Sequence, residues 1–343
     1  MLPSSGGRVH PGVLLGAGVG AGFIAAALAF SRSRGKSVGV SGGAGGGAVA
    51  SDAPLSTTSS AHTGAVYETE RAVQEYLLFH FAADAAVLPY SLSEGGAAAV
   101  PPGARRFAQR TAALALSLAR SSGAAGGELA ALDVGCAVGG STFALSSAAR
   151  AVGVDFSARF IEAAEALRRG GSLPFSYTVE GELLAAGLAA LPTDARAERC
   201  HFLQGDACAL PAAVRAAGPY HVVHAANLLC RLPDPARFLA QLPQLVAAGG
   251  IVLFVSPYSW LPAYTPRAAW LGGKADAAGA PIWSSDRLQA AMRELGFELF
   301  HEENVPFLIR EHARKFQWGC SHATAFRWAR GGGSAIKAAG GVV

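Results

Sequence analysis

Hydrophobic and polar positions along residues 126–256 follow two periods in turn. Short apolar runs predict strands over 129–134, 151–155, 200–205, 219–226 and 250–256. The intervening stretches have helical spacing and predict helices over 140–150, 157–169, 211–217 and 234–247. Strands that alternate with helices indicate a parallel sheet with helices on both faces. We therefore expect an α/β, doubly wound, Rossmann-like fold.

Two further amphipathic stretches precede this pattern. The first, YETERAVQEYLLFHF at 67–81, predicts a helix with one apolar face, and the second, RRFAQRTAALALSLARSS at 105–122, predicts a helix that ends near Gly123. The apolar residues of the first helix are Val73, Leu77, Leu78 and Phe81. We expect an N-terminal helical cap over 64–125 on a core that spans 126–330.

The N-terminal 63 residues differ from the rest of the chain. Residues 12–30 form a run of nineteen uncharged residues, about 28 Å long as a helix, which is just enough to cross a bilayer. Arg32, Arg34 and Lys36 follow the run and favour a cytosolic catalytic part if it is an anchor. Its many glycines and alanines, with no acid before Asp52, also fit a cleaved organelle-targeting peptide or a soluble tail.

Low-complexity segments flank the expected domain at 64–330. Residues 37–63 are rich in Gly, Ser, Ala and Thr and predict a flexible linker. Residues 331–343, GGGSAIKAAGGVV, predict a disordered tail. Three locations thus stay open: a membrane-anchored protein with a cytosolic catalytic domain, an organelle-targeted protein, or a soluble cytoplasmic one.

The composition favours a globular enzyme over a nucleic-acid-binding protein. Hydrophobic residues make up 51% of the chain and charged residues 15%, which is apolar enough to bury a large core. The net charge of +4 comes from the two ends, because the charges of residues 61–330 sum to zero. Without a basic stripe, binding to nucleic acid is disfavoured. The five cysteines form no CxxC pair, so we expect reduced thiols and no metal site.

The stretch ALDVGCAVGG, residues 131–140, follows the first predicted strand with a run of small residues. An NTP-binding loop needs a lysine before its final Ser or Thr, whereas Ser141 follows Gly140 directly. The Gly-x-Gly-x-x-Gly spacing of a dinucleotide loop is absent, and Asp133 would repel a pyrophosphate. A phosphate-free adenosine cofactor with an ammonium and a sulfonium fits better, because Asp133 attracts its cationic end.

Polar residues also stand at the ends of three further strands. Asp155 ends the second strand, where a carboxylate can accept hydrogen bonds from both ribose hydroxyls of such a cofactor. Asp206 ends the third and is placed to meet the adenine amino group, and Asn227 ends the fourth, facing the sulfonium methyl. A single strand-end acid often only caps a helix, but four polar residues at successive strand ends favour one shared ligand.

These motifs resemble the class I S-adenosylmethionine-dependent methyltransferases over residues 126–256. The resemblance implies a mostly parallel seven-stranded sheet and S-adenosylmethionine as cofactor. Ala137 departs mildly from the pattern, since many members carry glycine there. The residues implied to bind the cofactor are Asp133, Gly135, Cys136, Ala137, Gly139, Asp155, Phe156, Asp206, Ala207 and Asn227.

A narrower resemblance covers about residues 65–328. YETERAVQEYLLFHF, LDVGCAVGGSTFAL, GVDFSARFIEAA, AANLLCRLPDPARFL, SPYSWLPAYTPRAAWLGG and PFLIREHARKFQW look like the methyltransferase that completes ovothiol biosynthesis by methylating an imidazole nitrogen of 4-mercaptohistidine. In that family the domain is often fused to an iron-dependent sulfoxide synthase. The resemblance therefore implies a separate sulfoxide synthase as the partner that supplies the thiol.

The residues suit such a reaction. Methyl transfer is an in-line displacement, so the enzyme chiefly aligns the acceptor and excludes water, and an imidazole lone pair needs no strong base. Aromatic residues gather in an insertion at 257–283, and we expect Tyr258 and Trp260 to sandwich the acceptor ring beside Asn227. Further expected acceptor contacts are Tyr264 and Trp270, with Arg267, Arg310 or Arg314 on the carboxylate and Glu311 on the amine. His80, His221 and His224 are expected to be structural.

Two other functions stay open on sequence grounds. One is a methyltransferase for another small thiol or amine. The other is a catalytically silent S-adenosylmethionine-binding protein, against which Asp133, Asp155 and Asp206 argue because all three strand-end acids are present.

Overall fold

The computed structural model describes residues 65–90, 103–123 and 127–328, which all belong to the unit Ala48–Val343. The expected anchor or targeting segment, the linker and the C-terminal tail lie outside these residues and stay predictions. Within the part of the chain that is described, no helix combines the length and the apolar character that crossing a membrane requires.

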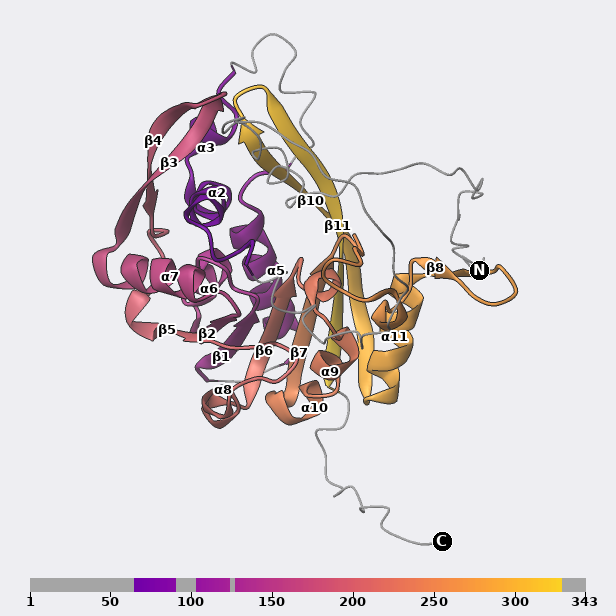
Figure 1. Cartoon of the computed structure of the whole chain (residues 1–343). Coiled ribbons are helices and arrows are strands. Elements are labelled where there is room, and N and C mark those ends of the chain that lie inside the picture. The colour runs from indigo at the N-terminus through magenta and orange to yellow at the C-terminus, as the bar shows by residue number, and fades with distance from the viewer. Residues whose placement is uncertain (1–64, 91–102, 124–126, 329–343) are drawn as a thin grey trace, which may run out of the picture. The chain divides into compact units, whose positions relative to one another are not determined.

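A seven-stranded sheet in the order β10-β11-β7-β6-β1-β2-β5 forms the centre of the fold (Figure 1). Strands β5, β2, β1, β6 and β7 run parallel, whereas β11 runs antiparallel to β7 and β10 antiparallel to β11. The predicted Rossmann-like, mostly parallel seven-stranded sheet is confirmed. The strands are β1 (Leu129–Val134), β2 (Ala149–Asp155), β5 (Cys200–Gln204), β6 (Tyr220–Ala226), β7 (Val246–Ser256), β10 (Phe297–His312) and β11 (Lys315–Trp328).

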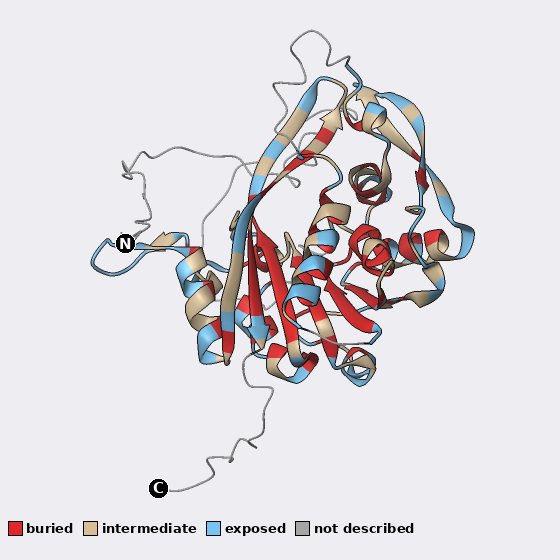
Figure 2. Ribbon diagram, turned by 180° about the vertical axis from the view of Figure 1, so that it is seen from behind, coloured by how far each residue is buried: buried red, intermediate tan, exposed pale blue. Residues whose placement is uncertain are grey.

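Helices cover both faces of this sheet, whose central strands β1, β2, β6 and β7 are buried along most of their length (Figure 2). Apolar residues of α5 pack on one face, and those of α8, α9, α10 and α11 pack on the other. Burial on both faces explains why the central strands read as continuous apolar runs. The helices are α2 (Glu70–Phe81), α3 (Asp84–Val87), α5 (Phe107–Ser121), α6 (Gly140–Leu145), α7 (Ala158–Gly170), α8 (Ala212–Ala217), α9 (Pro235–Leu239), α10 (Leu242–Leu245) and α11 (Ser284–Glu294).

Helix α2 begins as its sequence suggests. The Thr69 hydroxyl accepts a hydrogen bond from the Ala72 amide at 3.1 Å, which satisfies one of the free amides of the first turn. Val73, Leu77 and Leu78 are buried, so the predicted apolar face is confirmed for these three residues, while Phe81 is half-buried.

Two predicted helices are shorter than expected. The helix predicted at 140–150 ends at Leu145, where the hydroxyls of Ser146 and Ser147 donate to the carbonyls of Phe143 and Ala144. Such local bonds compete with the helical pattern, and β2 begins four residues later. The helix predicted at 234–247 is divided into α9 and α10, with a proline in the first turn of each.

Two hairpins that the sequence patterns did not predict extend from the sheet region. One consists of β3 (Ser172–Glu180) and β4 (Leu183–Ala190), which form a separate two-stranded sheet. The other is the far half of β10–β11, because β11 pairs with β7 only from His322 to Arg327 and continues past the carboxyl end of β7. The two hairpins meet where the Ala313 amide donates to the Val179 carbonyl at 3.0 Å.

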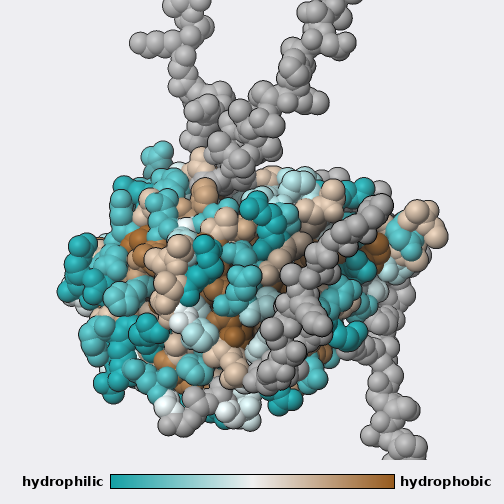
Figure 3. Space-filling model, turned by 90° about the horizontal axis from the view of Figure 1, so that it is seen from below, coloured by the Kyte–Doolittle hydropathy of each residue, from teal (hydrophilic) through white to brown (hydrophobic). Residues whose placement is uncertain are grey.

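These hairpins, with α2 and α3 between them, stand at one end of the sheet in Figure 1. They reach beyond the carboxyl ends of the parallel strands, where ligands bind in sheets of this class. Figure 3 shows the opposite end of the molecule, seen from below. This face is mainly hydrophilic, with apolar residues in small separate patches. The strand ends under the hairpins are therefore the place to look for a site.

Candidate active site

The loop between β1 and α6 turns sharply at the carboxyl end of the sheet. Gly135, Ala137 and Gly139 have φ values of 75°, 47° and 89°. A Cβ atom added to Gly135 would lie 2.8 Å from Cδ1 of Leu228, the residue that follows Asn227 after β6. Glycine is therefore required at Gly135 for both conformation and space.

Asp155 at the end of β2 holds this loop in place. Its Oδ2 accepts from the Ala137 amide at 2.9 Å, and its Oδ1 accepts from the Ser157 amide at 2.9 Å. The first bond supports Ala137 in the left-handed conformation, which is unusual for a residue with a side chain. Burial raises the pKa of Asp155 to about 6. Each carboxylate oxygen can accept a second hydrogen bond, so Asp155 can still bind a ligand.

Asp133 at the end of β1 is only 2% exposed, and protein groups occupy both of its oxygens. The Thr142 hydroxyl donates to Oδ2 at 2.7 Å, and His224 Nδ1 lies 2.7 Å from Oδ1. Both contacts support the loop, and a direct contact of Asp133 with a cationic ligand stays a prediction. A second histidine, His80 on α2, also supports this loop, because its Nδ1 accepts from the Gly140 amide at 3.1 Å. Burial lowers the pKa of His80 to about 4.

The turn after β5 contains the predicted adenine-side residues. Asp206 accepts from the Cys208 amide at 2.8 Å through Oδ1. Ala207 is buried, and its carbonyl accepts from Gln241 at 2.9 Å. Phe156, directly after Asp155, is 58% exposed. All three lie at the same sheet edge as Asp155, and their roles in binding stay predictions.

Asn227 and Tyr258 follow the two neighbouring strands β6 and β7. Both have positive φ, 53° and 52° respectively, so each marks a sharp turn at the strand end. Asn227 Oδ1 accepts from the Ser321 hydroxyl of β11 at 2.7 Å, and the Tyr258 hydroxyl lies 3.2 Å from His322 Nδ1. Burial raises the pKa of Tyr258.

The two predicted aromatic partners of the acceptor, Tyr258 and Trp260, have different surroundings. Trp260 is buried, donates to the Ser284 hydroxyl at 2.8 Å and stacks on Trp270 with ring centroids 6.2 Å apart. These contacts favour packing of the insertion for both tryptophans. Tyr264, in contrast, contacts the segment that precedes α2, with its ring centroid 6.1 Å from that of Tyr67.

The predicted head-group residues do not gather in one place. Arg310 is buried on β10, where it donates to the carbonyls of Ala86 and Thr178 and lies over the Tyr177 ring at 4.8 Å. It thus joins β10 to α3 and β3. Arg267 is exposed on a single 3₁₀ turn, Arg267–Ala269.

Glu311 and Arg314 lie at the tip of the β10–β11 hairpin. Glu311 forms an ion pair with Lys315 at 2.7 Å and accepts from Gln317 at 2.9 Å, and these contacts lower its pKa despite burial. The Arg314 guanidinium lies 5.2 Å from the centre of the Tyr90 ring. A role of either residue in acceptor binding stays a prediction.

A cluster that the sequence reasoning missed lies beside Asp155. The Arg231 guanidinium sits 4.8 Å from the centre of the Tyr264 ring. Its charge acts on the hydroxyls of Tyr67 and Tyr76, and the charge of Asp155 also acts on Tyr76. Burial raises the pKa of both tyrosines, so they remain neutral donors at physiological pH. The only sequence signal for Arg231 is its place four residues after Asn227, in the same strand-end segment.

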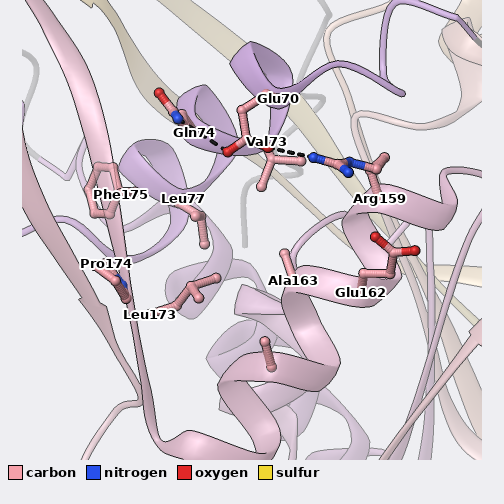
Figure 4. Close-up of a pocket in the computed structure, with 11 residues that line it drawn as sticks. Glu70, Val73, Gln74, Leu77, Arg159, Glu162, Ala163, Leu173, Pro174 and Phe175 are labelled. Atoms are coloured by element: carbon pink, nitrogen blue, oxygen red, sulfur yellow. Dashed lines mark hydrogen bonds and ion pairs between the residues drawn. The ribbon is translucent and has the colours of Figure 1, made fainter.

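A cavity of about 240 Å³ opens elsewhere, between α2, α7 and β3 (Figure 4). On its polar side Glu70 accepts from Gln74 at 3.2 Å and pairs with Arg159 at 2.5 Å. Its apolar side includes Leu77 and Phe175. None of the predicted site residues lines this cavity, so it is separate from the strand-end site.

The order of the sheet and its strand-end acids define a class of protein, the Rossmann-like α/β proteins, in which ligands bind at the carboxyl ends of the strands. The sequence matches the methyltransferase domain family over residues 104–302, more than half of the chain. The chain therefore belongs to this family and is a methyltransferase. No curated protein matches it.

Solved structures of similar fold include other methyltransferases. The magnesium protoporphyrin IX methyltransferase of Synechocystis PCC 6803, solved with bound S-adenosylmethionine, is 14% identical with a TM-score of 0.42, and the match covers 81% of this chain and 100% of that chain. A glycopeptide N-methyltransferase in complex with sinefungin is 14% identical with a TM-score of 0.37, and the match covers 63% and 93% of the two chains.

Proposed function

We propose that this methyltransferase uses S-adenosylmethionine to methylate an imidazole nitrogen of 4-mercaptohistidine, the last step of ovothiol biosynthesis. The carrying observation is the Asp155 carboxylate, which braces the loop after β1 through the Ala137 amide and keeps acceptor capacity for ribose hydroxyls. The contacts between Arg231 and the tyrosines around it support an acceptor site next to Asp155.

The residues around the loop fit this cofactor by their charge. No lysine or arginine occurs in residues 131–149, so the loop has no cation to neutralise a phosphate. Two carboxylates, Asp133 and Asp155, flank it instead. This arrangement disfavours nucleotide phosphates and favours a cofactor that carries positive charge.

When bound, S-adenosylmethionine supplies a methyl carbon on a sulfonium, to which the acceptor nitrogen donates its lone pair. The chain's own residues align the acceptor and exclude water. Asn227, held by Ser321, stands at the turn after β6, and Tyr258 stands at the turn after β7. Tyr67 and Tyr76 cover the strand ends from the α2 side with neutral phenols.

The acceptor is proposed from the resemblance outside the cofactor motifs. The segments concerned include residues 67–81 and 256–273, and Tyr67, Tyr76 and Tyr264 from these segments lie close together beside Arg231. An aromatic cluster with one guanidinium suits a small acceptor that has a flat ring and an anionic group. A separate sulfoxide synthase that supplies the thiol is part of this proposal.

The test is incubation of the protein with S-adenosylmethionine and 4-mercapto-L-histidine, followed by NMR of the product. We expect a new N-methyl signal on the imidazole and a kcat/KM at least a hundredfold lower for L-histidine, because histidine lacks the sulfur that fixes the rotation of the ring. Methylation of sulfur, or equal rates on both compounds, would refute the proposed acceptor. Mass spectrometry with a panel of small thiols and amines would then identify the substrate.

A further inference from the structure

The Arg231 guanidinium is held in place by the protein, but no acidic side chain of the described residues neutralises its charge. It is half-buried in the 3₁₀ turn Leu229–Arg231, and its Nη1 donates to the carbonyls of Cys230 at 3.0 Å and Ser259 at 2.8 Å. Among the described residues, no carboxylate lies within ion-pair distance of it. An arginine withdrawn from water without an acidic partner is costly unless a ligand supplies the anion.

The free side of this guanidinium has the geometry of a carboxylate receptor. With Nη1 committed to backbone carbonyls, Nε and Nη2 form the remaining pair of donors, and such a pair binds the two oxygens of a carboxylate side by side. Tyr264 lies under the guanidinium, and the phenols of Tyr67 and Tyr76 are close enough to feel its charge. The surroundings are thus apolar rings and neutral donors.

The position points to the acceptor rather than to the cofactor. Arg231 is connected through Ser259 to the segment that follows β7, and it follows Asn227 at the end of β6. Asp155, which we assign to the ribose, acts on the same Tyr76 hydroxyl as Arg231 does. Tyr76 is therefore within electrostatic reach of both Asp155 and Arg231.

We propose that Arg231, supported by Tyr67, Tyr76 and Tyr264, binds the α-carboxylate of the acceptor, so that this enzyme selects amino acids over the corresponding amines. This inference rests on the proposed function for the identity of the acceptor. It replaces the head-group arginines expected from the sequence, because Arg310 is committed to α3 and β3.

The experiment is calorimetry on the enzyme loaded with S-adenosylhomocysteine, with 4-mercapto-L-histidine and its decarboxylated counterpart 4-mercaptohistamine as probes. We expect the parent enzyme to bind the amino acid at least thirtyfold more tightly. Arg231→Met should remove this preference by weakening the amino acid alone, and leave the affinity for S-adenosylhomocysteine unchanged. The matched control is Arg237→Met, an exposed arginine of α9, which should change none of the three affinities.

Several outcomes would overturn the assignment. Equal weakening of both probes would show that Arg231 faces the thiolate or supports the fold, and weaker binding of S-adenosylhomocysteine would assign it to the cofactor. Arg231→Lys keeps the positive charge but loses the paired donors Nε and Nη2, so it separates an effect on folding from an effect on carboxylate recognition. We expect this variant to bind the amino acid about tenfold more weakly and the amine with unchanged affinity. Equal losses for both probes in this variant also contradict the proposal.

A failure of the proposed function can be distinguished from a failure of the carboxylate site. If the parent enzyme does not bind 4-mercapto-L-histidine, the pairs histidine and histamine, cysteine and cysteamine, and tyrosine and tyramine are tested in its place. If the parent enzyme prefers one of these acids over its amine and Arg231→Met abolishes the preference, the carboxylate site is supported and only the proposed acceptor is refuted. A parent enzyme that prefers no acid overturns the site.

Discussion

At the scale of single residues, Asp155 combines two tasks that depend on its ionised form. Its oxygens accept the Ala137 and Ser157 amides, and they are the acceptors we assign to the ribose. Burial raises its pKa from 3.8 to about 6. Since the folded-state pKa lies above the unfolded value, the stability linked to this group is full below pH 3.8 and is lost as the pH rises through about 6.

Cofactor binding should show the opposite pH dependence. Ribose hydroxyls donate to the carboxylate, so we expect the affinity for S-adenosylmethionine to be constant above pH 7 and to fall as the pH drops below about 6. Asp155→Asn should bind at least tenfold more weakly at pH 8, from the loss of charged hydrogen bonds of about 1.5–3 kcal/mol. Its affinity should be flat between pH 5 and pH 8. Calorimetry across this range checks both, and an unchanged profile in the variant would remove Asp155 from the ribose.

Trp260 illustrates how a residue with a plausible chemical role acquires a packing one. Because its ring stacks on Trp270 and its indole donates to Ser284, Trp260→Ala should lower the free energy of unfolding by about 3–5 kcal/mol. Trp260→Phe keeps a ring and should lose about 1 kcal/mol with the hydrogen bond. Urea denaturation measures both values. A Trp260→Ala enzyme of parental stability but slower turnover would favour the catalytic role predicted from the sequence.

At the scale of elements, Arg310 connects the two hairpins that stand over the strand ends. It donates to Ala86 of α3 and Thr178 of β3 from its place on β10. We expect Arg310→Met to accelerate hydrogen exchange in residues 172–190 at least tenfold and to leave residues 129–134 unchanged, because β1 lies in the middle of the sheet.

A matched control for this contact is Arg293→Met, which removes an exposed arginine from α11. It should change the exchange of neither segment. If Arg310→Met raises the KM for the acceptor while exchange at 172–190 stays parental, Arg310 binds substrate as the sequence predicts and does not hold the hairpins together.

At the scale of the whole molecule, the described sheet, its helices and the candidate site lie within residues 65–328. We expect a protein of residues 61–343 to stay soluble, with an affinity for S-adenosylmethionine within twofold of the full chain. Calorimetry and thermal melting test this expectation. Aggregation or loss of binding would mean that the domain begins before residue 61. Cell fractionation of both proteins would also test whether residues 12–30 anchor or target the chain.

The alternation of parallel strands with helices between residues 129 and 256 was predictable from the sequence alone, because the central strands are buried on both faces and therefore appear as short apolar runs. The strand-end positions of Asp155 and Asn227 followed from the same pattern, since the carboxyl ends of parallel strands share one edge. The hairpin β3–β4 was missed because outward-facing leucines such as Leu183, which is 67% exposed, hide the alternation of a surface strand.

Only the tertiary structure decided which side chains meet at the site. Arg231 and Tyr67 are more than 160 residues apart in the sequence. They come together because the Tyr67 carbonyl accepts from the Ser157 hydroxyl after β2 at 3.0 Å and the Tyr67 ring lies 6.1 Å from Tyr264, the ring under Arg231. In the same way Asp133 is engaged by Thr142 and His224, although its spacing alone suggested a ligand contact. Local periodicity determines which face of an element is buried, but the partners on that face depend on how the elements pack.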